Sequence, residues 1–229
     1  MITLTPDEAR VLGVLIEKAM TTPDQYPLTQ NSVVNGVNQK NNRDPVISMD
    51  DNRAFDALEG LRGKGILVRV NQAGSRVDKF RHNAGDVLHA RPAELALLAE
   101  LMLRGPQTLG ELRGRASRMS AFESLEAVKN LLDAMMSRDE PLVKLLPPSP
   151  GSRAERYLQL LAPDAHPVDA SPATEPAAGA AAGNVPSLSD RVTQLEAEVT
   201  TLRRVIQAFA QTLGEPDPLA PAPPGESGE

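Results

Sequence analysis

The chain has 229 residues, no cysteine and a formal net charge of −6 at pH 7. This length accommodates one or two domains, and the absence of cysteine excludes a disulfide framework and thiol chemistry. No apolar run reaches the roughly 18 residues of a membrane span, and no signal segment begins the chain, so we expect a soluble, cytoplasmic protein. The acidic excess lies in residues 163–229, which hold 3 Lys and Arg against 10 Asp and Glu, and leaves residues 1–162 close to neutral.

Two helices are predicted at the start of the chain. Thr5-Pro-Asp-Glu8 combines a capping residue, a proline at the first helical position and a glutamate at the third, which is a capping box for a helix ending near Met20. Thr29 caps a short second helix, and Pro45 prevents this helix from continuing through the polar run 38–45.

A third helix and a β-hairpin follow. Asp50 or Asp51 caps the helix, its apolar side chains recur with a 3.6-residue period, and Gly63 and Gly65 end it. Residues 66–70 and 77–81 are then predicted as the two strands of a hairpin. Three helices followed by a hairpin are typical of a winged helix-turn-helix domain, which we assign to residues 1–88.

The same order of elements is predicted again in residues 89–162. The helices are expected over residues 93–103, from Thr108 to about Ala116, and from Ser120 or Ala121 onward. Apolar side chains directed inward from the last of these helices are Leu125, Val128, Leu132 and Met135. Strands are expected over residues 142–146 and 156–161. The predicted fold class is therefore mostly α with small β-hairpins (α+β), with two tandem winged helix-turn-helix domains.

The remainder of the chain differs in composition. Residues 163–186 are rich in alanine, proline and glycine and predict a disordered linker, whereas residues 215–229 predict a disordered acidic tail. Between them, residues 187–214 carry apolar positions with alternating spacings of four and three, which predict a coiled-coil helix and a weak parallel homodimer. The alternative is a helix that folds back onto its own chain. The seam consists of Leu188, Val192, Leu195, Val199, Leu202, Ile206, Phe209 and Leu213.

Three blocks of the first half carry a family resemblance. TTPDQYPL at residues 21–28, NQKNNRDPV at residues 38–46 and GLRGKG at residues 60–65 resemble the bacterial YceH-like proteins of uncharacterised function. The resemblance covers residues 4–161 and implies a tandem winged-helix fold. It implies no reaction, because no established activity comes with the family.

Sequence signatures of catalysis are missing. His82, His89 and His166 lie far apart in the sequence, and no G-x-S-x-G motif is present. The glycines of residues 60–65 follow a helix and precede a strand, the reverse of a phosphate-binding loop. We therefore predict a protein that is not an enzyme and that needs no cofactor and no metal.

Basic and amide residues form a candidate nucleic-acid site at the places where winged helices approach DNA. They come from the turn before the third helix, from that helix, from both hairpins, and from the second helix of the second half. The set is Lys40, Asn41, Asn42, Arg43, Arg53, Arg76, Lys79, Arg81, Arg113, Arg115, Arg118, Arg153 and Arg156. An alternative for Arg43 is an ion pair with Asp44 or Asp56.

The acidic character of the third helix opposes insertion into a DNA groove. Asp50, Asp51, Asp56 and Glu59 stand there against the single Arg53. We predict a DNA-associated regulatory protein that contacts the backbone of double-stranded DNA through its wings. The alternative is a winged-helix scaffold that binds a protein partner without sequence-specific DNA binding.

Overall fold

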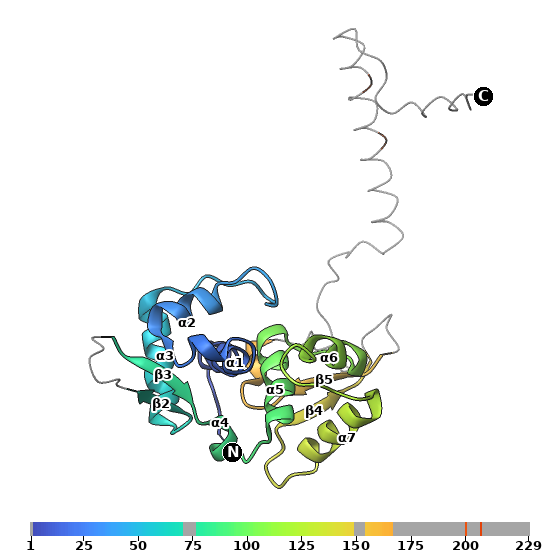
Figure 1. Ribbon diagram of the computed structural model, residues 1–229. Coiled ribbons are helices and arrows are strands. Elements are labelled where there is room, and N and C mark those ends of the chain that lie inside the picture. The colour runs from blue at the N-terminus through green and yellow to red at the C-terminus, as the bar shows by residue number, and fades with distance from the viewer. Residues whose placement is uncertain (1, 71–76, 149–153, 167–199, 201–206, 208–229) are drawn as a thin grey trace, which may run out of the picture. The chain divides into compact units, whose positions relative to one another are not determined.

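The computed structural model describes residues 2–70, 77–148, 154–166, 200 and 207. The described part combines helices with small antiparallel sheets, an α+β architecture as predicted (Figure 1). Its residues 2–166 belong to one compact unit. Every residue of the predicted coiled-coil seam and of the predicted acidic tail lies outside the described residues, so both remain predictions.

The first half contains three long helices and a three-stranded sheet. Its elements are α1 (Pro6–Thr21), η1 (Pro23–Gln25), β1 (Leu28–Thr29), α2 (Gln30–Val37), α3 (Asp51–Gly63), β2 (Leu67–Val70), β3 (Lys79–His82) and the short α4 (Ala84–Val87). The side chains of Thr5, Thr29 and Asp50 accept hydrogen bonds from the first turns of α1, α2 and α3, so all three predicted caps are confirmed. Gly65 follows α3 with φ +74°, the left-handed conformation that glycine adopts without steric cost.

The sheet of the first half has the strand order β1-β3-β2 and is antiparallel throughout. Its register pairs Val68 with Arg81 and Val70 with Lys79, so these four side chains share one face of the sheet. Phe80 points to the opposite face and is buried in the core. Residues 71–76, the predicted turn of the hairpin, lie outside the described part.

The second half repeats this order. Its elements are α5 (Pro92–Arg104), α6 (Leu109–Ala116), α7 (Leu125–Met136), β4 (Val143–Leu146), β5 (Arg156–Gln159) and η2 (Pro163–Ala165). An isolated bridge between Gln107 and Tyr157 corresponds to the pairing of β1 with β3 in the first half.

Three predictions for the second half were wrong. The helix expected from Ser120 or Ala121 begins only at Leu125, because the Ser124 side chain accepts from the backbone N–H of Ala127 and caps the helix there. Leu125 was expected to point inward and is 47% exposed. Residues 163–166, predicted as the start of the disordered linker, are instead folded, since η2 contacts α1 and His166 is buried.

One interaction occurs in both halves. Glu8 accepts from the backbone N–H of Thr5 at the start of α1, and Glu94 accepts from that of Arg91 at the start of α5. Each carboxylate also pairs with a cation that follows the third helix of its own half, namely Lys64 and Arg138. The pairs tie the first helix of each half to the end of the third.

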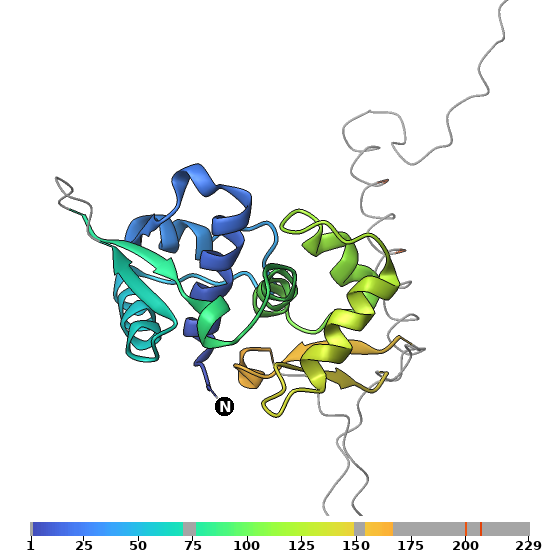
Figure 2. The ribbon, with the colours of Figure 1, turned by 60° about the horizontal axis from the view of Figure 1, so that its bottom comes forward.

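The two halves share one hydrophobic core. Figures 1 and 2 show α5 in the middle of the compact unit, between α1 on one side and α6 and α7 on the other. Gly13 of α1 faces Leu103 of α5, where an added Cβ would lie 3.0 Å from the leucine side chain. Backbone bonds join the halves as well, from Leu4 N–H to Leu161 O at 2.7 Å and from Asp44 N–H to Leu103 O at 2.9 Å. The duplicated elements therefore pack as a single body.

Candidate functional site

Arg43 of the candidate nucleic-acid set is buried in the protein. Its guanidinium donates to both carboxylate oxygens of Glu17, at 3.2 and 2.6 Å, and to Gly36 O at 2.8 Å. The side chain has no exposed surface. Arg43 is therefore not available to a phosphate, and its partner is Glu17 rather than Asp44 or Asp56.

Arg118 links the two halves. It pairs with Glu17 on α1 and, at 2.8 Å, with Glu100 on α5, while Arg104 pairs with the other Glu100 oxygen at 2.9 Å. We call Glu17, Arg43, Glu100, Arg104 and Arg118 the junction cluster. Both carboxylates are at most 1% exposed, so they require these arginines to offset their desolvation.

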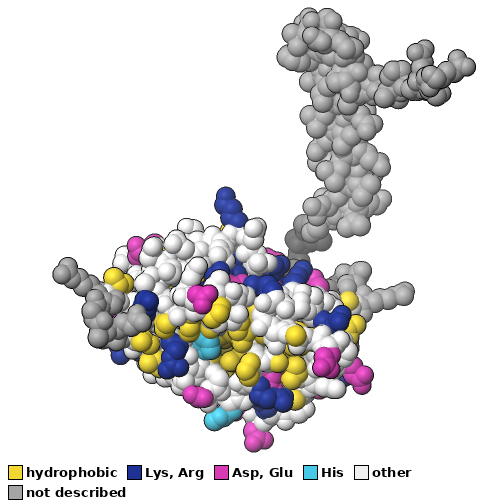
Figure 3. Space-filling view, viewed as in Figure 1, with side chains coloured by type: hydrophobic (Ala, Val, Ile, Leu, Met, Phe, Trp, Pro, Cys, Tyr) yellow, Lys and Arg dark blue, Asp and Glu magenta, His cyan; other side chains and the backbone are white. Residues whose placement is uncertain are grey.

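The electrostatics of the junction cluster favour ionised side chains. Burial alone would raise the pKa of Glu17, but hydrogen bonds and charges from Arg43 and Arg118 outweigh it and lower this pKa below its ordinary value. Burial would likewise lower the pKa of Arg118, yet the bonds to Glu100 and Glu17 raise it. Lys and Arg side chains gather at the upper edge of the molecule in Figure 3, near the ends of α5 and α6 labelled in Figure 1. Three arginines and two carboxylates leave the cluster with one net positive charge.

Most other candidate arginines in the described part also have partners within the chain. Arg53 donates to both oxygens of Asp7, at 3.0 and 2.7 Å, and its pKa is raised mainly by these bonds. Arg115 pairs with Glu111 at 3.1 Å and donates to Gln107 at 2.9 Å. Arg113 donates to Glu123 O at 3.4 Å, Arg156 is half-buried, and Asn42 accepts from Arg104. Arg76 and Arg153 lie outside the described residues.

Four candidate residues form no ion pair with a described residue, whereas the exposed Arg53 and Arg113 donate to Asp7 and to Glu123 O. Lys40 and Asn41 are exposed in the loop after α2. Lys79 and Arg81 lie on the outer face of β3, as their spacing predicted, and neither forms an ion pair with a described residue. The structure thus divides the candidate set into a buried junction and a short basic stripe on the first hairpin.

A groove beside α3 contains an exposed aromatic residue that the sequence analysis did not single out. This α3 groove, of about 320 Å³, lies between residues 29–31 at the start of α2, Phe55 and Glu59 of α3, and residues 69, 77, 78 and 80 of the hairpin. Phe55 is 49% exposed and Val77 is 57% exposed. Asp51 and Asp56 are exposed on the same helix. An apolar surface bordered by carboxylates suits a protein segment better than a DNA groove.

The described residues contain no group of three or more His, Cys, Asp or Glu side chains that could hold a metal ion. Within the same ranges, no helix combines the length and the apolar character needed to span a bilayer.

Sequence reasoning missed both carboxylates of the junction cluster. Glu17 lies in the apolar run VLIEKAM of α1 and Glu100 in LLAELML of α5. A single acidic residue within an apolar helix face is the available signal, because a buried carboxylate needs a cation near it. The sequence does not say which of the arginines supplies that cation.

The geometry defines a class of α+β proteins with a duplicated unit of three helices and an antiparallel sheet, joined by buried ion pairs. Residues 4–152 match the family described as "Protein of unknown function, DUF480". The chain is 44% identical to a UPF0502 protein of Geobacter sulfurreducens over 216 residues, which is 93% of this chain and 96% of that protein. It is 46% identical to a UPF0502 protein of Koribacter versatilis over 200 residues (87% and 90%), and 41% identical to one of Shewanella piezotolerans over 210 residues (90% and 97%). The chain belongs to this DUF480/UPF0502 family, with which the YceH-like resemblance agrees.

Proposed function

We propose that the chain is a tandem winged-helix protein that acts as an interaction scaffold and binds an apolar, basic segment of a protein partner in its α3 groove. The repeated order of three helices and a hairpin supports the winged-helix assignment. The observation that carries the binding proposal is Phe55, 49% exposed between carboxylates on the helix that a DNA-binding winged helix would insert into the major groove.

The ion pairs that the arginines form within the chain support the same proposal. Arg43 and Arg118 neutralise buried carboxylates, and Arg53 is paired with Asp7. A protein that neutralises phosphates needs cations that are not already compensated. Few of the basic residues meet this condition, whereas Asp51 and Asp56 complement a basic partner.

One observation favours the second candidate function, contact with the DNA backbone. Lys79 and Arg81 share the outer face of β3, where a wing reaches a phosphate chain. Two such contacts would give a weak complex, whose affinity falls with salt by a log–log slope of about 0.9 for each phosphate contact.

Two experiments on the full chain separate these functions. A photo-crosslinking amino acid at position 31, on the border of the α3 groove, should capture a protein partner, and Phe55→Ser should abolish the adduct. The same amino acid at position 144, an exposed position of strand β4, is the matched control. In parallel, labelled genomic fragments are titrated at low salt with the wild-type protein and with the Lys79→Ala/Arg81→Ala variant. Salt-sensitive DNA binding that this variant weakens, together with no adduct at position 31, would replace the scaffold proposal by the DNA-binding one.

A further inference from the structure

A second, larger pocket lies at the connection between the two halves. It has a volume of about 770 Å³ and is bordered by the segment after α4, by the turn between α7 and β4, and by both ends of the compact unit. Ile2, Leu88, Leu142 and Leu161 supply apolar surface, and the three leucines are 7%, 5% and 1% exposed. We call it the connector pocket. Its size falls within the range of about 300–1,000 Å³ that is common for small-molecule sites.

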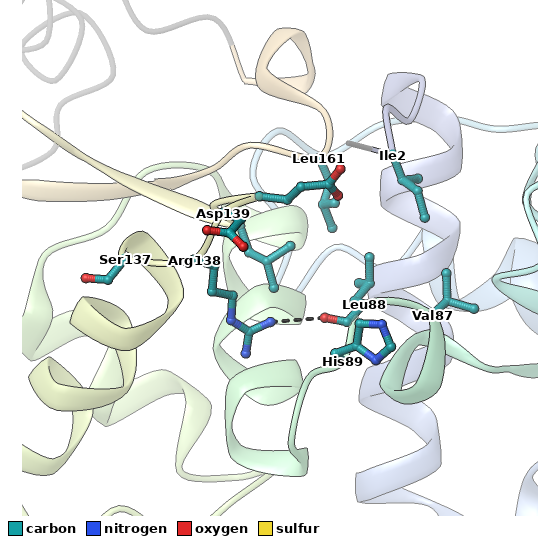
Figure 4. Close-up of a pocket in the computed structure, with 10 residues that line it drawn as sticks. Ile2, Val87, Leu88, His89, Ser137, Arg138, Asp139 and Leu161 are labelled. Atoms are coloured by element: carbon teal, nitrogen blue, oxygen red, sulfur yellow. Dashed lines mark hydrogen bonds between the residues drawn. The ribbon is translucent and has the colours of Figure 1, made fainter.

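One end of the connector pocket carries hydrogen-bond donors. Arg138 donates through Nη1 to Leu88 O and through Nη2 to Glu94, both at 3.0 Å, and its side chain is 25% exposed. These two bonds fix the guanidinium and leave further N–H donors for a ligand. Figure 4 shows Arg138 and the His89 ring on either side of Leu88.

The backbone of His89 has an uncommon conformation. Its φ of +48° lies in the left-handed region, which residues other than glycine rarely adopt. The side chain is exposed at the pocket. Conformations of this kind persist where the surrounding structure maintains them, and they are concentrated at binding sites.

Carboxylates lie on the same rim. Asp139 is exposed there, and Glu140 also lines the pocket. Since Glu94 already compensates Arg138, a simple anion would meet the negative charge of Asp139, whereas a simple cation would meet the guanidinium. A ligand that carries both charges on an apolar body matches the cationic end, the carboxylate rim and the leucine surface together.

We propose that the connector pocket binds a short aliphatic peptide with free amino and carboxyl ends. Its carboxylate accepts hydrogen bonds from Arg138 and His89, its ammonium group pairs with Asp139, and its side chains pack on Leu88, Leu142 and Leu161. A peptide suits the volume better than a single amino acid, which would leave much of it filled with water. This binding is independent of the α3 groove, because the two sites share no residue.

The first test measures binding of L-leucyl-L-leucine to the full chain by titration calorimetry and by the rise in melting temperature. N-acetyl-leucyl-leucine lacks the ammonium group, and leucyl-leucine amide lacks the carboxylate. We expect each of them to bind about tenfold to a hundredfold more weakly than the free dipeptide, the loss typical of one charge-assisted hydrogen bond. No binding by any of the three at millimolar concentration, or equal binding by all three, would overturn the proposal.

Variants then locate the site. Asp139→Asn should weaken the free dipeptide about tenfold and leave the acetylated one unchanged. His89→Asn, which tolerates the left-handed backbone, should weaken the free dipeptide and leave the amide unchanged. Asp164→Asn is the matched control, because Asp164 is exposed and does not line the pocket. Dipeptide binding that neither Asp139→Asn nor His89→Asn reduces would assign it to another site and refute the inference.

Discussion

Arg43 provides the sharpest test of the junction cluster. Five oxygens accept hydrogen bonds from its guanidinium, one each from Gly36, Gln39 and Asn42 and two from Glu17. Arg43→Ala would leave the Glu17 carboxylate, which is 1% exposed, with Arg118 as its remaining cation. Removing one partner of a buried ion pair lowers the free energy of unfolding by about 3–5 kcal/mol. For a folded unit of this size, that corresponds to a melting temperature about 10 °C lower.

Urea denaturation of the full chain measures this loss, and Lys40→Ala is the control. Lys40 is exposed three residues earlier in the same loop, so its replacement should change the free energy of unfolding by less than about 0.5 kcal/mol. Glu17→Gln should lower the free energy of unfolding less in the Arg43→Ala variant than in the wild type. The difference between the two losses, which is the coupling energy of the pair, should be about 1 kcal/mol or more. If the free energy of unfolding of Arg43→Ala lies within about 1 kcal/mol of the wild-type value, the Arg43–Glu17 pair does not stabilise the fold.

Three further predictions concern stability. Arg118→Met should lower the free energy of unfolding by about 1–3 kcal/mol in urea, because Glu17 and Glu100 each lose a donor, whereas the exposed Arg113→Met should have little effect. Gly36→Ala should cost about 1–3 kcal/mol, since its Cβ would lie 2.6 Å from Val14 Cγ1, whereas Gly63→Ala meets no atom within 4 Å and should not destabilise. Burial and the neighbouring Arg81 lower the pKa of His82 from 6.5 to about 4, so the unfolded chain binds the proton first as the pH falls. The stability that this group contributes is fully present above pH 6.5 and is lost between pH 6.5 and 4, so the free energy of unfolding should fall by about 2 kcal/mol at pH 5. If His82→Leu loses as much stability as the wild type over this pH range, the loss does not come from His82.

The helix caps were predictable because each depends on residues three positions apart. Thr5, Thr29, Asp50 and Thr108 each accept from the backbone N–H three residues later, and local sequence contains all of this information. The start of α7 was missed for a related reason. Ser120 and Ser124 are both acceptable capping residues, and only the packing of the helix decides between them.

The candidate site was harder to predict, because its contacts are distant in sequence. Arg43 and Glu17 are 26 positions apart, and Arg118 and Glu17 are 101 positions apart. A basic residue in a turn has the same local pattern whether it faces solvent or a buried carboxylate. The positions of Lys79 and Arg81 could be predicted because alternation along a strand is local. Phe55 also lies within a regular helix, but the groove beside it exists only once β2 and β3 pack against α3.

Comparison of the two duplicated halves shows where the exposed faces of their third helices, α3 and α7, differ. Superimposing the caps of their third helices, Asp50 and Ser124, aligns the buried Ala54 with the buried Val128, which preserves the inward face. The same alignment sets Phe55 against the exposed Lys129, so α7 has no apolar residue at the position of Phe55, and its own exposed Leu125 aligns with Asp51 instead. The features needed for folding occur in both halves, namely the helix caps and the ion pairs Glu8–Lys64 and Glu94–Arg138. The exposed Phe55 occurs in the first half alone, so the duplicated fold does not require it. The asymmetry therefore directs the search for a partner to the first half, while the halves together form the connector pocket.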